Sequence, residues 1–270
     1  IVDVDRMETV GRVTFPPIPS DANATLITQS VIAASQRGVM FMTSAGQIWS
    51  IIGDEAVPRR ASAIIGSNAA GQQNAIAAPR QMASTPNGEN IIVYGNGTVY
   101  LYDALVDDFV QSRQIQAANA SGFVGPVTAG PRGQYYVVNG LVLNQALTPV
   151  ADAPRQPGVG NTAGTNTTTN IPVAAVASIG NTNYARFVQP IRANANALAT
   201  SAPNIEIVDI NTGLATRTAP ALEGPIATVA GNGRTTIAGR AMAVDSALTN
   251  AFVLTASGLS IVPLDTIAVA

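Results

Sequence analysis

The chain has 270 residues, of which 47% are hydrophobic and 11% are charged, and its formal net charge is −2. It contains no Cys, no His and no Lys, so its 14 basic residues are all Arg; this excludes disulfides, thiolate or imidazole catalysis and lysine Schiff bases. The near-neutral charge predicts no nucleic-acid partner, and no apolar run reaches the roughly 18 residues that would predict a membrane-spanning segment.

The first third of the chain reads as short strands separated by turns. The first 15 residues alternate apolar and polar side chains and predict two outer strands that meet at Arg6-Met7-Glu8. A complete unit of strands follows, over 26–34, 38–43, 47–52 and 56–62. The stretch 63–78 then reads as a loose connection or a short helix.

The stretch 79–115 shows one such unit most clearly. We predict four strands in it, at 82–84, 91–94, 99–102 and 109–115. Turn signals, Pro86-Asn87-Gly88 and Gly95-Asn96-Gly97, separate the first three strands. The second strand is a continuous apolar run suited to burial on both faces, and the fourth is polar enough for a sheet edge. This is the anatomy of a β-propeller blade.

The rest of the chain repeats the pattern with longer connections. A compact unit covers 125–151, and a larger one covers 172–219 with a long insert at 190–204. The stretch 154–170 is rich in Gly, Thr and Asn and predicts a long loop, and 223–240 reads as irregular. The last unit offers three strands, and the chain stops where a fourth should begin.

A recurrent Asp supports one family of repeats. Asp5, Asp103, Asp209 and Asp265 each end a predicted third strand, and the spacing of these positions is near fifty residues, roughly one blade. The fold class is therefore predicted as all-β, a single β-propeller domain over 1–270 with about six or seven blades of four antiparallel strands. The strand count leaves the terminal blade incomplete. Three explanations are open: a six-bladed ring that lacks half a blade, a seven-bladed ring whose remaining strands lie outside this chain, or strands supplied by a neighbouring subunit.

The third and fourth strands of one unit, "IEIVDINTGLATRTAPALEGP", resemble the YVTN and NHL repeats of bacterial surface or secreted β-propellers. This resemblance implies a propeller fold on the outside of the cell. It implies little about activity, because propellers of these types have mixed functions. The absence of Cys and the Asn/Thr-rich loops also favour an extracellular or cell-surface location.

The connections 63–78, 154–170, 190–204 and 223–240 should emerge on one face of a propeller. The predicted ligand-binding residues on this face are Arg155, Arg192, Arg234 and Arg240. Guanidinium groups hold anions in a bidentate fork, so the ligand would be a carboxylate or a sulfated, anionic glycan. The competing interpretation is that these are isolated arginines in contact with solvent.

We predict no catalytic residues, no metal site and no cofactor. The strand-end aspartates are expected to accept hydrogen bonds from the turns that follow them, and tyrosines such as Tyr100/Tyr102 and Tyr135/Tyr136 are expected to pack between blades. The leading hypothesis is a non-catalytic extracellular scaffold with protein partners or self-assembly, as in a surface or filamentous assembly. The alternative is a glycan-binding or carbohydrate-active propeller with a site on the loop-rich face.

Overall fold

The computed structural model describes most of the chain in two compact units, Ile1–Ala120 and Ser121–Ala270, and each is treated by itself. The residues described are 1–3, 5–13, 28–43, 46–60, 62–66, 75–78, 80–115, 126–138, 140–151, 173–188, 203–224, 227–229, 235–237, 241–255 and 257–269. All regular elements in them are strands except one short 3-10 helix. The prediction that 1–270 forms one domain stays a prediction.

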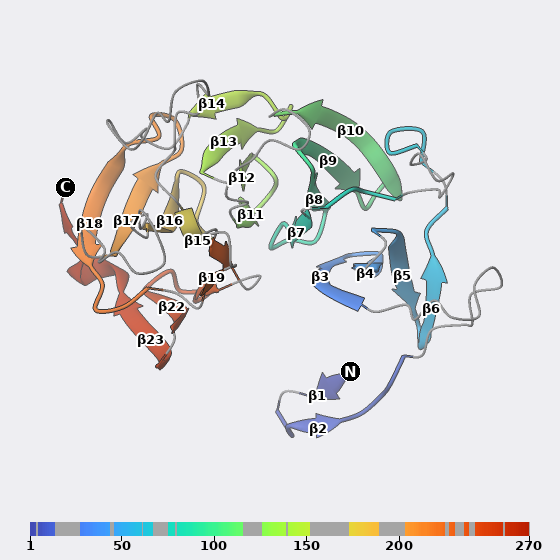
Figure 1. Cartoon of the computed structure of the whole chain (residues 1–270), viewed down its shortest axis with the longest axis horizontal. Coiled ribbons are helices and arrows are strands. Elements are labelled where there is room, and N and C mark those ends of the chain that lie inside the picture. Colours follow the sequence, from blue (N-terminus) through green and yellow to red (C-terminus); the bar gives the residue numbers. More distant parts are fainter. Residues whose placement is uncertain are drawn as a thin grey trace. The chain divides into compact units, whose positions relative to one another are not determined.

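The unit Ile1–Ala120 opens with a hairpin and continues with two four-stranded antiparallel sheets (Figure 1). The hairpin and the first sheet consist of β1 (Val2–Asp3), β2 (Glu8–Thr9), β3 (Thr28–Ser35), β4 (Gly38–Thr43), β5 (Ile48–Ile52) and β6 (Glu55–Pro58). The second sheet consists of β7 (Arg80–Ser84), β8 (Asn90–Gly95), β9 (Thr98–Asp103) and β10 (Asp108–Gln114). Neighbouring strands follow one another in sequence, as a propeller blade requires.

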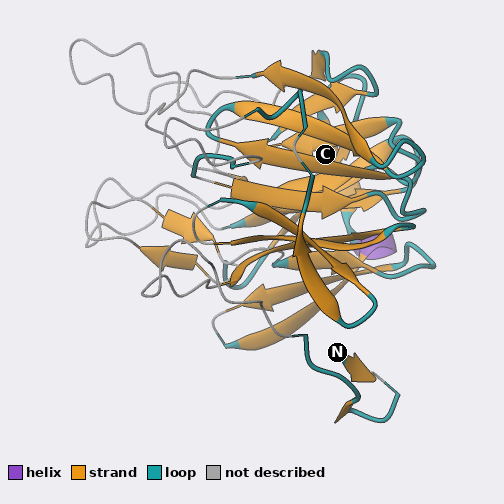
Figure 2. Ribbon diagram, turned by 90° about the vertical axis from the view of Figure 1, so that its right-hand side faces the viewer, coloured by secondary structure: helices purple, strands orange, loops and turns teal. Residues whose placement is uncertain are grey.

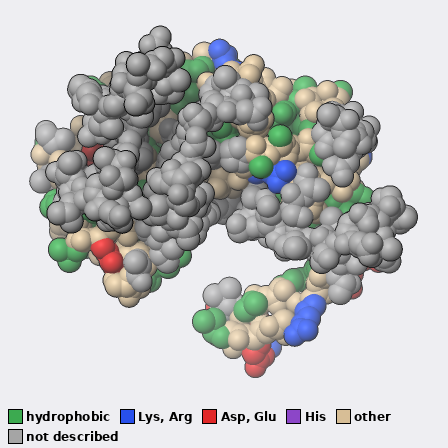
Figure 3. Space-filling model, in the orientation of Figure 1, with side chains coloured by type: hydrophobic (Ala, Val, Ile, Leu, Met, Phe, Trp, Pro, Cys, Tyr) green, Lys and Arg blue, Asp and Glu red, His purple; other side chains and the backbone are tan. Residues whose placement is uncertain are grey.

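The hairpin β1–β2 forms a sheet of its own. Ile1 is 62% exposed and Met7 is 80% exposed, and Asp3 pairs loosely with Arg6 at 4.0 Å. Hydrophobic, acidic and basic side chains therefore lie beside one another on this segment, at the bottom of Figure 3.

Burial follows the predicted strand character. In β8, Ile91, Ile92 and Val93 are fully buried, whereas β10 is largely exposed beyond Phe109. The strand β3 lies beside β7, and the two sheets share a core that contains Met40, Ile48 and Val93. A strand that is apolar on both faces is stable only between two neighbouring layers, and the first sheet of this unit provides one of them for β8.

The unit Ser121–Ala270 contains further sheets of the same kind (Figure 1). Its two larger sheets consist of β11 (Val127–Ala129), β12 (Tyr135–Val138), β13 (Leu141–Asn144) and β14 (Pro149–Ala151), and of β15 (Val173–Ile179), β16 (Asn183–Val188), β17 (Asn204–Asp209) and β18 (Ala215–Pro220). A three-stranded sheet consists of β21 (Met242–Val244), β22 (Asn250–Thr255) and β23 (Gly258–Pro263). The short turns between the strands appear as teal loops in Figure 2.

Two elements of this unit differ from the sequence-based expectation. The stretch 223–240 contains an antiparallel pair, β19 (Ala227–Val229) and β20 (Thr235–Ile237). After β23 the chain forms the 3-10 helix Leu264–Thr266 and the strand β24 (Ala268–Val269), which pairs with β18 of the neighbouring sheet. We expected the end of the chain to begin a fourth strand beside β23. Instead, β24 is the fifth strand of the sheet β15–β18.

Candidate ligand-binding site

The strand-end aspartates shape turns. The carboxylate of Asp103 accepts a hydrogen bond from the backbone N–H of Leu105 at 2.7 Å, and that of Asp209 accepts one from the N–H of Thr212 at 2.9 Å. Hydrogen bonds from Thr212 and the neighbouring backbone hold the pKa of Asp209 below its usual range. The turn prediction is confirmed at these two positions.

The structure differs from the turn prediction at the other two recurrent aspartates, Asp5 and Asp265. At the N-terminus the turn acceptor is Asp3, whose Oδ1 binds the N–H groups of Asp5 and Arg6 at 3.0 and 3.1 Å. Asp265 lies in the 3-10 helix Leu264–Thr266. At the N-terminus the accepting residue is therefore two positions earlier than predicted, Asp3 in place of Asp5. The spacing of aspartates along the sequence does not show which residue directly precedes the chain reversal.

All four predicted ligand-binding residues, Arg155, Arg192, Arg234 and Arg240, lie outside the described residues. The anionic-ligand hypothesis built on them stays a prediction. Among the residues that the structure describes, no three acidic side chains gather closely enough to hold a metal ion, and no helix is long and apolar enough to cross a membrane.

Three of the four tyrosines pack inside the protein as predicted, whereas Tyr100 is only partly buried against the core of the unit Ile1–Ala120. Tyr102, Tyr135 and Tyr136 are at most 1% exposed, and the hydroxyl of Tyr135 donates to the carbonyl oxygen of Asn183 at 2.7 Å. Burial raises the pKa of Tyr135. These three buried rings are therefore inaccessible to a sugar ligand.

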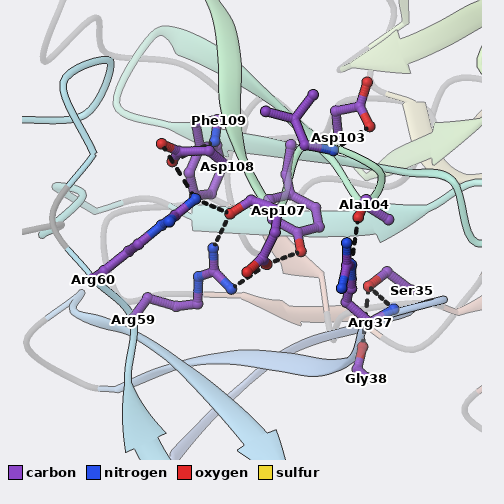
Figure 4. A network of polar contacts seen from close by, with 12 residues as sticks. Ser35, Arg37, Gly38, Arg59, Arg60, Asp103, Ala104, Asp107, Asp108 and Phe109 are labelled. Carbon is purple, nitrogen blue, oxygen red and sulfur yellow. Dashed lines mark hydrogen bonds and ion pairs between the residues drawn. The ribbon is translucent and has the colours of Figure 1, made fainter.

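A network of polar contacts lies in the unit Ile1–Ala120, around the turn between β9 and β10 (Figure 4). Asp107 has a left-handed backbone, φ 60°, which Asp adopts more readily than most residues. Its Oδ1 accepts hydrogen bonds from Arg59 and from the hydroxyl of Tyr102, both at 2.7 Å. Arg59 and Arg60 also donate to the Asp107 carbonyl oxygen, at 2.7 and 2.9 Å.

A third arginine approaches the same turn from the first sheet. Arg37 follows β3, and its Nε donates to the carbonyl oxygen of Ala104 at 2.8 Å. A second guanidinium nitrogen donates to the carbonyl oxygen of Leu105 at 3.3 Å. The turn after β9 is thus held by arginines from a sheet that lies about 50 to 70 positions earlier in the sequence.

A cavity of about 200 Å³ opens between these groups. Its lining includes Arg37, Ile52, Arg59, Tyr102 and Asp107. The two guanidinium groups and one carboxylate make the lining positive by one charge. Since typical cofactor pockets hold about 300–1,000 Å³, this one fits a single side chain.

The electrostatics of this cavity favour binding over catalysis. Burial, together with the bond to Asp107, raises the pKa of Tyr102 to about 12, so the hydroxyl stays protonated. Burial tends to raise the pKa of Asp107, but the hydrogen bonds from Tyr102 and Arg59 and the arginine charges outweigh it and lower that pKa. An ionised, hydrogen-bonded carboxylate is a poor general base.

The sequence contains the charged residues of this site, but their positions along the chain do not show that they meet. The adjacent pairs Arg59-Arg60 and Asp107-Asp108 are conspicuous in a chain with so few charges. Arg60 lies 3.9 Å from Asp108. Only the packing of the two sheets shows that the arginines and aspartates meet.

Comparison with known proteins supports the fold and gives no family. No protein-family model matches the sequence, and no curated protein matches it. Solved structures do match. The β-propeller domain of Cps50 (Swd1) from Myceliophteria thermophila matches with a TM-score of 0.52 and 10% identity, over 85% of this chain and 68% of that chain.

Two further matches have the same character. BamB from Moraxella catarrhalis matches with a TM-score of 0.51 and 12% identity, over 90% of this chain and 64% of that chain. A chain of the mitotic checkpoint complex matches with a TM-score of 0.52 and 10% identity, over 97% of this chain and 67% of that chain. This chain thus spans about two thirds of each.

These matches, with the successive four-stranded antiparallel sheets, define the class: the protein has a β-propeller fold. The predicted fold class is confirmed. The number of blades, the YVTN or NHL repeat type and a bacterial source stay predictions.

Proposed function

We propose that this chain uses the exposed face of its last sheet, β21–β23, as an interaction surface. In β8, β12 and β16, each the second strand of its sheet, every residue after the first is buried. In β22 burial alternates: Ala251 and Val253 are fully buried, Phe252 is partly exposed and Leu254 is 47% exposed. The sequence of β22, "NAFVLT", is as apolar on both faces as the other second strands.

The exposed face continues onto β23. Leu259 pairs with Leu254 and is 59% exposed, and Ile261 pairs with Phe252 and is 58% exposed. The opposite face packs into a core with Phe187 and Ile207 of the neighbouring sheet. Because Leu254, Leu259 and Ile261 are about half exposed, complete burial of each would contribute about 1 kcal/mol, so the face favours association with another surface.

We propose that this chain is a non-catalytic β-propeller that serves as an interaction scaffold, and that the apolar face of β21–β23 associates with a second copy. That uncovered face carries the proposal. The scarcity of ionisable side chains supports a role without catalysis, and the composition, free of Cys and rich in Asn and Thr, supports a place outside the cell or at its surface. Two copies joined through this face would close into a dimer, and a second contact between dimers would extend them into a surface or filamentous assembly.

The test is the mass in solution, by light scattering, of the wild-type chain and of a Leu259→Asp/Ile261→Asp variant. We expect the wild type to associate and the variant to have the mass of one 27.6 kDa chain, because a charge on this face opposes its burial. Leu214→Asp is the matched control, since Leu214 is 61% exposed in the turn between β17 and β18.

Circular dichroism should show that all three proteins keep their sheets. A wild type that stays monomeric at high concentration would refute the association. So would an intact native chain heavier than 27.6 kDa whose additional residues cover Leu259 and Ile261.

A further inference from the structure

Arg37 is an exposed arginine whose side chain is nevertheless fixed in place. Its Nε and one terminal nitrogen donate to the carbonyl oxygens of Ala104 and Leu105, at 2.8 and 3.3 Å. Its own backbone N–H donates to the hydroxyl oxygen of Ser35 at 3.1 Å. Because the guanidinium is already ordered, a ligand that binds it loses little further side-chain entropy.

The charge of Arg37 is also unbalanced locally. Arg59 pairs with Asp107 at 2.7 Å, and Arg60 lies 3.9 Å from Asp108. Within the described parts of the chain, no carboxylate forms an ion pair with Arg37. The cavity thus presents a guanidinium whose remaining N–H groups are available to an anion.

Apolar side chains stand next to this charge. Ile52, which lines the cavity, is 64% exposed, and Leu105, whose carbonyl oxygen binds Arg37, is 86% exposed. Val106 in the same turn is 55% exposed. Arginine is one of the residue types enriched in protein-binding hot spots, and apolar neighbours of such an arginine exclude water from it when a partner binds.

We propose that this cavity binds the carboxylate side chain of an acidic residue flanked by apolar residues, on a segment of a protein partner. Arg37 donates to the carboxylate, and Ile52 and Leu105 contact the flanking apolar side chains. An anion is favoured over a cation because the lining holds two guanidinium groups and one carboxylate, and the Oδ1 of that carboxylate already binds Arg59 and Tyr102. The site goes beyond the proposed association, which uses β21–β23.

The test uses two tripeptides, N-acetyl-Leu-Glu-Leu-amide and its Gln counterpart, added to the protein labelled with 15N-arginine. The Nε–H signal of Arg37 is assigned by its loss in Arg37→Gln. We expect the Glu peptide to shift this signal with saturation on the order of 1 mM, as suits one charged and two apolar contacts, and the Gln peptide to leave it in place.

Variants are compared by saturation-transfer NMR, which observes the peptide. Arg37→Gln and Ile52→Asn should each weaken binding of the Glu peptide at least several-fold. Arg132→Gln, at an exposed arginine of the turn before β12, should not change it. Circular dichroism and the fluorescence of Trp49 report whether each variant is folded.

Three results would overturn the proposal. They are equal shifts from the Glu and Gln peptides, an equal loss in Arg132→Gln, and binding of acetate as tight as that of the Glu peptide. The last result would mean a site for small carboxylates without recognition of a peptide. All three leave the association of β21–β23 untouched, because it is read from mass in solution.

Discussion

Asp107 is the residue on which the polar contacts of the unit Ile1–Ala120 converge. Its carboxylate binds Arg59 and Tyr102, its carbonyl oxygen binds Arg59 and Arg60, and the Arg59 guanidinium lies 5.2 Å from the Tyr102 ring centre. These contacts join two sheets through one turn. Loss of the charge should therefore loosen the contact between the sheets as well as the turn.

We expect Asp107→Asn to lower the free energy of unfolding of this unit by about 1–2 kcal/mol at neutral pH, a value reduced for the 38% exposure of the Asp107 side chain. Asn tolerates the left-handed backbone, so the change tests the charge. Urea unfolding followed by Trp49, which is 5% exposed and the only tryptophan, measures the effect.

The effect should depend on pH with a definite sign. The pKa of Asp107 is lower in the folded protein than in the unfolded chain. Its contribution is therefore fully present above the unfolded pKa, about 3.9, and is lost as pH falls through the lower folded pKa. The difference between wild type and variant should therefore shrink as the pH falls below about 3.9. Asp54→Asn, at an exposed position between β5 and β6, is the control, and an equal loss there would contradict the prediction.

A second residue-scale prediction concerns the buried ion pair of Arg186 and Glu206. Their side chains lie 2.6 Å apart and are 2% and 15% exposed. Glu206→Gln leaves a buried guanidinium without its counter-charge and should cost about 3 kcal/mol. The double variant Arg186→Leu/Glu206→Leu should lie closer to the wild type. Urea unfolding followed by circular dichroism compares them, and a double variant as unstable as the single one would refute this explanation.

At the scale of elements, the link between the first two sheets depends on Gly46. The backbone N–H of Ile76 donates to the Gly46 carbonyl oxygen at 2.9 Å, and Gln47 bridges to Ala75. Gly46 has φ +86°, and a Cβ on it would lie 2.1 Å from the Ile76 carbonyl oxygen. The segment 75–78 therefore passes too close to Gly46 for any side chain.

Gly46→Ala should lower the free energy of unfolding by more than about 2 kcal/mol, because both the backbone conformation and the close approach oppose it. Gly53→Ala provides the matched control: Gly53 has φ +65°, but nothing lies within 4 Å of the added Cβ. We expect this control to cost about 1 kcal/mol from the backbone alone. Unfolding followed by Trp49 fluorescence compares them, and equal losses would exclude a steric role for the 75–78 segment.

Strand positions were predictable at this scale, and strand partners less so. The predicted strands at 38–43, 91–94 and 99–102 correspond to β4, β8 and β9. The pairing of β24 with β18 was not expected. A strand is recognised from the spacing of its own side chains, but the edge that it joins depends on residues about fifty positions away.

At the scale of the whole molecule, the all-β propeller fold followed from repeated strands and turn residues, since each blade is built from local antiparallel connections. The absence of His, Cys and Lys removed whole classes of catalysis without any structure. The uncovered face of β21–β23 could not be foreseen, because β22 has the same apolar character as strands that are buried on both sides.

The sequence by itself determined the strands, the aspartate turns at Asp103 and Asp209 and the poverty of reactive groups, because these depend on residue types and on neighbours a few positions apart. Only the tertiary structure decided that Arg37, Arg59 and Asp107 line one cavity, that β24 joins β18 and that Leu259 and Ile261 stay exposed. The reason is physical. Charge pairing and burial depend on which surfaces meet, and those surfaces come from segments that are far apart in the chain.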